Sequence, residues 1–240
     1  MMKGSRLLLL SMLGVLPMLS CSDFWPTGEP EVSAETRFQE LERRLLEAET
    51  IYIDGGAGST GVVESAFEGK VILASGNRAR IQFTGQFASK NVLVALVSDG
   101  TTMWAGNGSD SFEEEAPAAL NEGIIVGLTR MGILHNLAVL SGASAPEGTD
   151  GNVHGWLTVT NFAWGEEETI DGVITETMTF DISVGGKPSA KARLWLNKET
   201  GFPVQRQQVV QFPNGEMTAV EVYEAFGIDA PFESDDFVVP

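Results

Sequence analysis

Side chains that bind metals or carry out redox chemistry are scarce in this sequence. Its 240 residues include one cysteine, Cys21, and two histidines, His135 and His154. A single thiol excludes an internal disulfide, a cysteine-rich zinc site and a Cys-x-x-Cys redox pair. Two histidines leave little for a histidine-based metal site. We therefore expect no bound metal and no disulfide framework.

Positive charge is also scarce. Fifteen lysines and arginines stand against 33 aspartates and glutamates, which gives a net charge of -18. Such a surface repels nucleic acid and disfavours binding to an anionic membrane through a basic patch. With 43% hydrophobic residues, the composition is otherwise that of a globular protein with a substantial core. We expect no nucleic-acid partner.

The N-terminus has the pattern of a secretory signal. Lys3 and Arg6 precede the apolar stretch from Leu7 to Leu16, which is too short to span a bilayer comfortably. Met18 to Cys21 resembles a bacterial lipobox, in which a small residue precedes a cysteine that receives a diacylglycerol. We interpret residues 1–20 as a lipoprotein signal peptide and residues 21–32 as a flexible tether. Cys21 is then the lipid attachment site, where the attached acyl groups include palmitate.

A helix and a series of strands are predicted beyond the tether. Ser33 is a suitable N-cap for a helix over 34–48, whose apolar stripe is Phe38, Leu41 and Leu45. After a glycine-rich turn, apolar and polar residues alternate with the period of a half-buried strand. The predicted strands are 63–73, 80–87, 92–97, 101–105, 153–164, 177–184, 190–197, 204–212 and 216–226, of which 92–97 is an unbroken apolar run. About nine or ten sequential strands favour an antiparallel meander.

The segment from Pro117 to Leu140 departs from this pattern. Its apolar residues recur at helical spacing, and the helix is apolar on nearly every side. Such a helix is either enclosed by protein or embedded in lipid. Glu122, Arg130 and His135 argue against a membrane span. We therefore expect the curved sheet to enclose this helix.

Two short motifs match in letters but lack the structure that their chemistry needs. Residues 56–61 spell Gly-x-Gly-x-x-Gly, but a dinucleotide site requires a helix next, and residues 62–73 alternate as a strand does. Ser59 is one residue short of a Gly-x-Ser-x-Gly elbow and has no following helix. We interpret the stretch as a flexible turn and expect no cofactor.

Carboxylates are numerous, but they occur in runs, at 113–115, 166–168 and 235–236. A glycosidase needs two carboxylates opposed across a cleft, whereas runs are typical of solvated loops. No Asp-x-Asp/Asn-x-Asp/Asn-Gly calcium loop is present. His135, on an apolar helix, fits a hydrogen-bonded core or rim side chain better than a ligand. We expect no catalytic residues and no enzymatic activity.

Four short segments carry a family resemblance. Val97 to Trp104 forms a strand that turns at Asp-Gly and returns with an aromatic residue, and Arg80 to Phe83 precedes it. Leu194 to Val204 reads as a late strand and turn, and Phe232 to Pro240 as a closing segment. With the order of helix, meander, inserted apolar helix and second meander, these segments resemble the LolA/LolB superfamily over about residues 33–240.

This resemblance implies an α+β, β-dominated fold. We expect an incomplete antiparallel β-barrel, or half-barrel, with an N-terminal amphipathic helix and an inserted apolar helix that covers the concave face. It implies one LolA-like domain over residues 33–240 and a hydrophobic cavity between the sheet and the inserted helix. The candidate cavity residues are Phe67, Ile81, Phe83, Trp104, Ile124, Leu128, Met131 and Leu134.

The resemblance also implies a role. We expect a lipid-anchored protein that faces the periplasm and binds a lipid or acyl-chain ligand, in lipoprotein or lipid trafficking. Ser22 in place of Asp after the cysteine favours anchoring in the outer membrane. The alternative is an envelope sensor or interaction module of the RseB/MucB type, with a protein partner. LolA itself is soluble, whereas this chain has the lipobox, and it has no clear exposed leucine loop of the LolB kind.

Overall fold

The computed structural model describes residues 32–107, 110–140, 153–231 and 234–239. Residues 1–31, 108–109, 141–152, 232–233 and 240 lie outside the described residues. The predicted signal peptide, Cys21 and the tether up to residue 31 fall in the first of these ranges, so they stay predictions.

One open antiparallel sheet dominates the described part of the chain. Its twelve strands follow the order β6-β5-β4-β3-β2-β1-β12-β11-β10-β9-β7, with β8 paired to β9. They are β1 (Thr50–Gly61), β2 (Ser65–Ala74), β3 (Arg78–Phe87), β4 (Lys90–Asp99), β5 (Thr102–Gly106), β6 (Ser111–Glu115), β7 (Leu157–Trp164), β8 (Glu168–Ile170), β9 (Val173–Val184), β10 (Lys187–Asn197), β11 (Pro203–Phe212) and β12 (Gly215–Ile228). Strands β6 and β7 are the two edges, so the sheet is a half-barrel.

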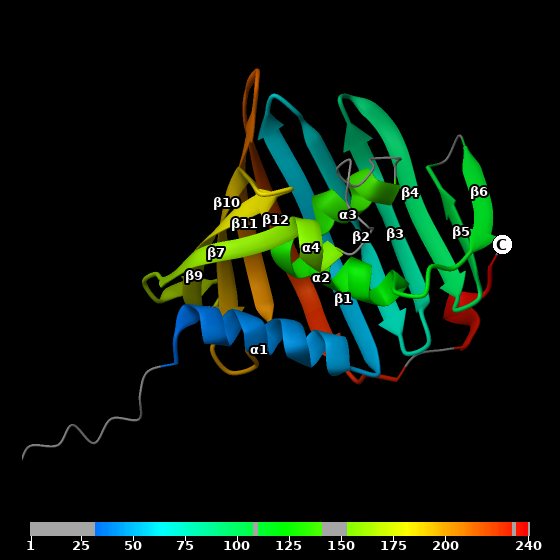
Figure 1. The fold of residues 1–240 in the computed structure, drawn as a ribbon, viewed down its shortest axis with the longest axis horizontal. Helices are drawn as coiled ribbons and strands as arrows, with labels where there is room; N and C mark the ends of the chain where they lie inside the picture. The colour runs from blue at the N-terminus through cyan, green and yellow to red at the C-terminus, as the bar shows by residue number, and fades with distance from the viewer. Residues whose placement is uncertain (1–31, 108–109, 141–152, 232–233, 240) are drawn as a thin grey trace, which may run out of the picture. The chain divides into compact units, whose positions relative to one another are not determined.

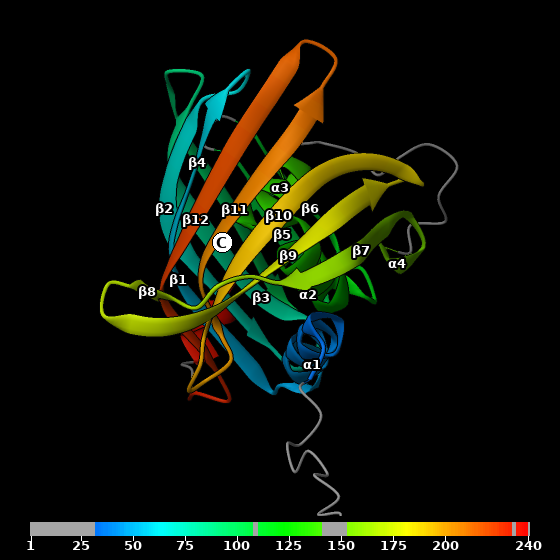
Figure 2. The ribbon, with the colours of Figure 1, turned by 90° about the vertical axis from the view of Figure 1, so that its left-hand side faces the viewer.

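The α-helices cover one face of this sheet. They are α1 (Ala34–Glu47), α2 (Leu120–Met131), α3 (Ile133–Leu140) and α4 (Val153–Trp156). The short 3-10 helix η1 (Ser234–Phe237) instead contacts Arg78 and Arg80, which are on the outward side of β3. Figures 1 and 2 show α1, α2 and α3 on the concave side of the curved strands. The predicted fold class, a β-dominated half-barrel with helices over its concave face, is confirmed.

The core lies between these helices and the inward side chains of the strands. Along β3, Ile81 and Phe83 are buried, whereas Gln82 and Thr84 point outward and are exposed. Helix α1 adds its apolar stripe, and the Oγ of Ser33 caps it by accepting a hydrogen bond from the backbone N of Thr36 at 3.1 Å. No helix among the described residues is long and apolar enough to cross a membrane.

The glycine-rich turn expected at residues 56–61 is wrong, because this stretch belongs to β1. A register shift between Asp54 and Gly55 brings the backbone of β12 very close to β1. A Cβ placed on Gly55 would lie 2.1 Å from the carbonyl oxygen of Val222. Glycine is therefore needed in this strand because the neighbouring strand leaves no room for a side chain.

The inserted helix is also not continuous. The sequence predicts one helix over 117–140, but the structure has α2 and α3, separated at Gly132. Gly132 has φ 87° and ψ −175°, a conformation that only glycine adopts readily. Two further expectations differ in detail: residues 153–156 are helical rather than extended, and the acidic run at 113–115 forms the edge strand β6.

Candidate ligand-binding cavity

A cavity of about 1370 Å³ opens between α3 and the ends of the β1–β2, β3–β4 and β11–β12 hairpins. This volume exceeds the roughly 300–1,000 Å³ of ordinary small-molecule pockets. The described lining residues are Ser59, Val63, Ser65, Phe67, Thr84, Gly85, Gln86, Phe87, Lys90, Asn91, Val92, Leu93, Val94, Asn107, Leu134, Leu137, Ala138, Phe212 and Met217. The cavity is therefore large enough for a long or branched ligand.

The deep wall of the cavity is apolar. Phe67 on β2 and Val94 on β4 are buried, and Val92 lies one inward position further along β4. Strand alternation places these side chains on the concave face, because β2, β3 and β4 pair in register. Leu134 and Leu137 of α3 approach from the other side. Their spacing of three residues puts both on one face of the helix.

The position of α3 depends on a buried arginine of β11. Arg206 is 1% exposed. Its guanidinium donates hydrogen bonds to the backbone oxygens of Thr129 at 2.9 Å and Arg130 at 2.6 Å, and to the side-chain oxygen of Gln208 at 2.8 Å. The last carbonyls of a helix have no partner within the helix, so Arg206 caps the C-terminus of α2. Burial lowers the pKa of Arg206.

A buried carboxylate caps the start of α3 in the same place. Glu221 of β12 is the cross-strand neighbour of Arg206. Its Oε1 accepts a hydrogen bond from the backbone N of Leu134 at 3.3 Å, and its Oε2 accepts one from the hydroxyl of Tyr223 at 2.6 Å. Burial raises the pKa of Glu221, and the charge of Arg206 opposes this rise. The break between α2 and α3 is thus held by two charged side chains of the sheet.

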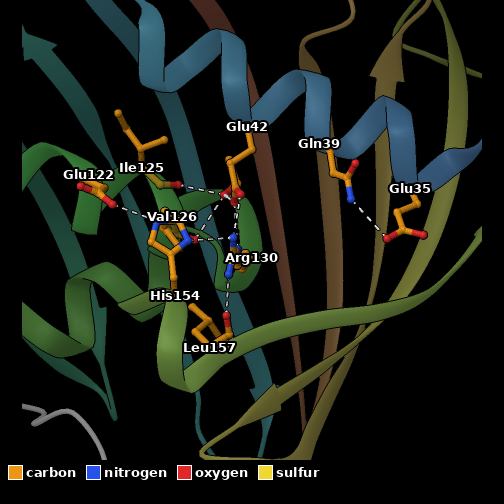
Figure 3. Close-up of polar contacts among 10 residues, drawn as sticks. Glu35, Gln39, Glu42, Glu122, Ile125, Val126, Arg130, His154 and Leu157 are labelled. Atoms are coloured by element: carbon orange, nitrogen blue, oxygen red, sulfur yellow. Dashed lines mark hydrogen bonds and ion pairs between the residues drawn. The ribbon is translucent and has the colours of Figure 1, made fainter. Parts of the chain in front are cut away.

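A second polar cluster joins α2 to α1 and α4, as Figure 3 shows. Arg130 of α2 donates to both carboxylate oxygens of Glu42 on α1, at 2.9 and 2.7 Å. Arg130 also contacts Nδ1 of His154 at 3.1 Å, and Nε2 of His154 lies 2.9 Å from Glu122. Thr129 donates to Glu42 at 2.8 Å. These contacts hold α2 against α1 and α4. The helix that lines the cavity is α3.

The candidate cavity residues from the sequence fall into three groups. Phe67 and Leu134 line the cavity. Ile81, Phe83, Ile124 and Leu128 surround a void of only about 10 Å³ between β3 and α2, and they are packed core. Met131 packs partly buried against the core at the end of α2, and Trp104 is half-buried on β5.

Sequence reasoning missed several of the side chains that matter here. Val92 and Val94 belong to the unbroken apolar run 92–97, in which no alternation marks the inward face. Arg206 and Glu221 had no local signal, because a charged residue in a strand is ordinarily expected to face solvent. Val220 and Val222 are 37% and 39% exposed, whereas Glu221 between them is 2% exposed.

The two histidines do not form a ligand site. His135 is half-buried, and its ring centroid lies 6.1 Å from that of Trp156. Burial, assisted by the charge of Arg206, lowers its pKa to about 4. The sequence predicts a hydrogen-bonded core or rim histidine. The half-buried position agrees with a rim side chain, but no hydrogen bond to His135 is found among the described residues. Within the same residues, no cluster of His, Cys, Asp and Glu could hold a metal ion.

No family model and no curated protein matches this sequence. Solved structures match its fold at low identity. LprF from Mycobacterium bovis matches with a TM-score of 0.46 and 15% identity, over 83% of this chain and 94% of LprF. The lipoprotein LppX from Mycobacterium tuberculosis matches with 0.40 and 14%, over 81% and 99% of the two chains.

A LolA superfamily protein from Nitrosomonas europaea matches with a TM-score of 0.36 and 10% identity, over 87% of this chain and 98% of its own. This chain is similar in fold to these structures.

Proposed function

We propose that this protein binds a lipid or acylated ligand in the cavity between α3 and the hairpin ends. The observation that carries the proposal is the cavity itself, about 1370 Å³ with buried apolar side chains from β2, β4 and α3 along its wall. Large, mainly apolar cavities with a few polar groups are the usual binding sites for small molecules in proteins.

The hydrophobic gain is sufficient for tight binding. Burying an acyl chain of about 15 methylenes contributes on the order of 12 kcal/mol, at about 0.8 kcal/mol each. Lost motion of the chain and ordering of α3 offset part of this gain.

A substitution that fills the cavity tests the proposal. Ala138 is exposed on α3 and lines the cavity, so Ala138→Trp should occupy ligand space without removing any core side chain. Ala66→Trp is the matched control, because Ala66 is exposed on the outward face of β2. The protein is purified from its producing cells, and native mass spectrometry and solvent extraction measure bound lipid. We expect lipid on the wild type and the control, and little on Ala138→Trp. Wild-type protein that carries no lipid and takes up no fluorescent fatty acid would refute the proposal.

We further propose that Cys21 is acylated and that the protein is anchored in the cell envelope, in the outer membrane and facing the periplasm. The support is the lipobox-like sequence before Cys21 and the serine after it. Acyl chains on one cysteine provide stable anchoring. Cys21→Ser should move the protein from the membrane fraction to the soluble envelope fraction. An unchanged distribution would contradict the anchor.

The second candidate is a sensor or interaction module with a basic partner. The observation that favours it is the edge strand β6, on which Glu113, Glu114 and Glu115 are all exposed. Acidic side chains beside an unpaired strand edge would attract a basic segment. An envelope protein that cross-links to the wild type and to Ala138→Trp, but not to a variant with glutamine at these three positions, would favour this function.

A further inference from the structure

The charges around the cavity differ from those of the chain as a whole. The sequence has 33 acidic and 15 basic residues. Yet the described cavity lining contains no aspartate or glutamate, and its one charged residue is Lys90. Glu64, in the turn after β1, and Glu216, at the start of β12, accept hydrogen bonds through their backbone oxygens near the cavity, but neither is among the lining residues.

The turn between β3 and β4 directs Lys90 toward the cavity. Ala88 and Ser89 have φ values of 46° and 65°, which is the geometry of a two-residue hairpin turn. This turn pairs Lys90 with Phe87 in register. Phe87 lies on the same face as the buried Phe83, and Lys90 lies on the same face as Val94. The lysine is therefore on the concave face, at the open end of the strand.

The ammonium group of Lys90 is available to a ligand. Lys70, Lys191 and Lys198 form ion pairs with Asp54, Asp181 and Glu167. Lys90 has no such partner among the described residues, and it is exposed.

Polarity changes along the cavity in the manner of an amphiphile. Phe67, Val94 and Leu137 are buried at the apolar wall, whereas Lys90 is exposed at the turn. An acyl chain would lie against the wall, and a polar head would lie at the turn. Since the lining there has a cation and no carboxylate, the head that fits has a negative charge.

We infer that the cavity selects amphiphiles with an anionic head, a carboxylate or a phosphate, and that Lys90 is the specificity-determining residue that binds this head. The inference rests on the proposed function and names its ligand class. An exposed ion pair contributes up to about 1 kcal/mol, so the preference over a neutral head of equal chain length is about fivefold. Raising the ionic strength should reduce it, because the pair is open to solvent.

The experiment compares hexadecanoate, hexadecanol and hexadecyltrimethylammonium, which share a chain length and differ in head charge. Each displaces a fluorescent fatty acid from the purified full chain, below the concentration at which it forms micelles. We expect the wild type to bind hexadecanoate most tightly, by about fivefold over the alcohol. Lys90→Gln should remove this preference, and Lys90→Glu should shift it toward the cation.

Lys187→Gln is the matched control. Lys187 is exposed and has no ion pair among the described residues, but it lies in the β9–β10 hairpin and does not line the cavity. It should keep the wild-type preference. Equal binding of all three amphiphiles by the wild type, or an unchanged preference in Lys90→Gln, overturns the inference while leaving a lipid-binding cavity. If none of the three displaces the probe, the proposed function and the inference fall together.

Discussion

Arg206→Met should strongly destabilise this protein. The guanidinium of Arg206 is buried and donates to two carbonyls at the end of α2, and it also lies 5.5 Å from the ring centroid of Phe180. Methionine fills similar space but donates no hydrogen bond. The variant therefore leaves two buried carbonyls without this donor, and it leaves Glu221 buried without a neighbouring positive charge.

The expected loss in the free energy of unfolding follows from the buried groups that Arg206→Met leaves without their partner. Leaving a buried hydrogen-bond acceptor without its donor costs about 1–3 kcal/mol of the free energy of unfolding. With two such carbonyls and the buried Glu221 nearby, the loss should be about 3–5 kcal/mol. This is a large part of the roughly 5–15 kcal/mol that holds a domain folded. For a domain of this size the melting temperature should fall by roughly 6–20 °C. Arg193→Met is the control, because Arg193 on β10 is 37% exposed and its ion pair with Glu168 should contribute less than about 1 kcal/mol.

Urea unfolding followed by tryptophan fluorescence measures the loss. A double-mutant cycle with Glu221→Gln then separates the coupling of the two side chains from the other effects of each. Because the glutamine introduced by this substitution has no charge, Arg206→Met should cost about 1–3 kcal/mol less in that background. A loss below about 1 kcal/mol in the single variant, or equal losses in the two backgrounds, would refute the buried pair as the device that holds the α2–α3 break.

Two further predictions concern the same region. Gly132→Ala should cost about 1–3 kcal/mol of the free energy of unfolding from backbone strain alone. The cost should be higher still because the new Cβ would lie 2.3 Å from a carboxylate oxygen of Glu221. Gly123→Ala, in the open part of α2, should instead stabilise the protein by about 0.5–1 kcal/mol, and thermal melts compare the two variants. The lowered pKa of His135, about 4 against 6.5 in the unfolded chain, means that the unfolded state takes up the proton first as the pH falls. The contribution of neutral His135 to the free energy of unfolding is complete above pH 6.5 and is lost between pH 6.5 and about 4. The full difference corresponds to roughly 3 kcal/mol, reduced to about 2 kcal/mol because the ring is partly exposed. Unfolding free energies of the wild type and His135→Gln that run parallel over this pH range would contradict the expectation.

Local structure was the most predictable part of the fold. The helix expected over 34–48 is found at Ala34–Glu47 with Ser33 as its cap. The alternating segments became strands, and the Asp99-Gly100 turn lies between β4 and β5 as expected. These features depend on residues that are near one another in the sequence, so the pattern contains the information that decides them.

The faces of the strands were less predictable. In β12, Val220 and Val222 would be the buried set by hydrophobicity, yet they are exposed, and Glu221 and Tyr223 point inward. The reversal becomes understandable only when α2 and α3 are in place, because their unpaired backbone groups need buried polar partners. A strand pattern alone does not contain that requirement.

The cavity residues, too, were predictable only where they depend on a local pattern. The inward position of Phe67 follows from strand alternation, and that of Leu134 from helical spacing, but the candidates nearest to the centre of α2, Ile124 and Leu128, proved to be packed core. Whether an apolar side chain meets a helix or an open space depends on where the helix ends. That point, Gly132, is set by contacts with β11 and β12.

By itself, the sequence determined the acidic character of the protein, its β-dominated class, its first helix and most of its strands, because composition and short-range periodicity are sufficient for these. Only the tertiary structure decided that the inserted helix breaks, that β1 is a strand despite its glycines, and that the cavity lies beside α3 with Lys90 at its mouth. Each of these depends on groups far apart in the chain, such as Arg206 and the end of α2, whose hydrogen bonds and close backbone approaches exist only in the folded protein.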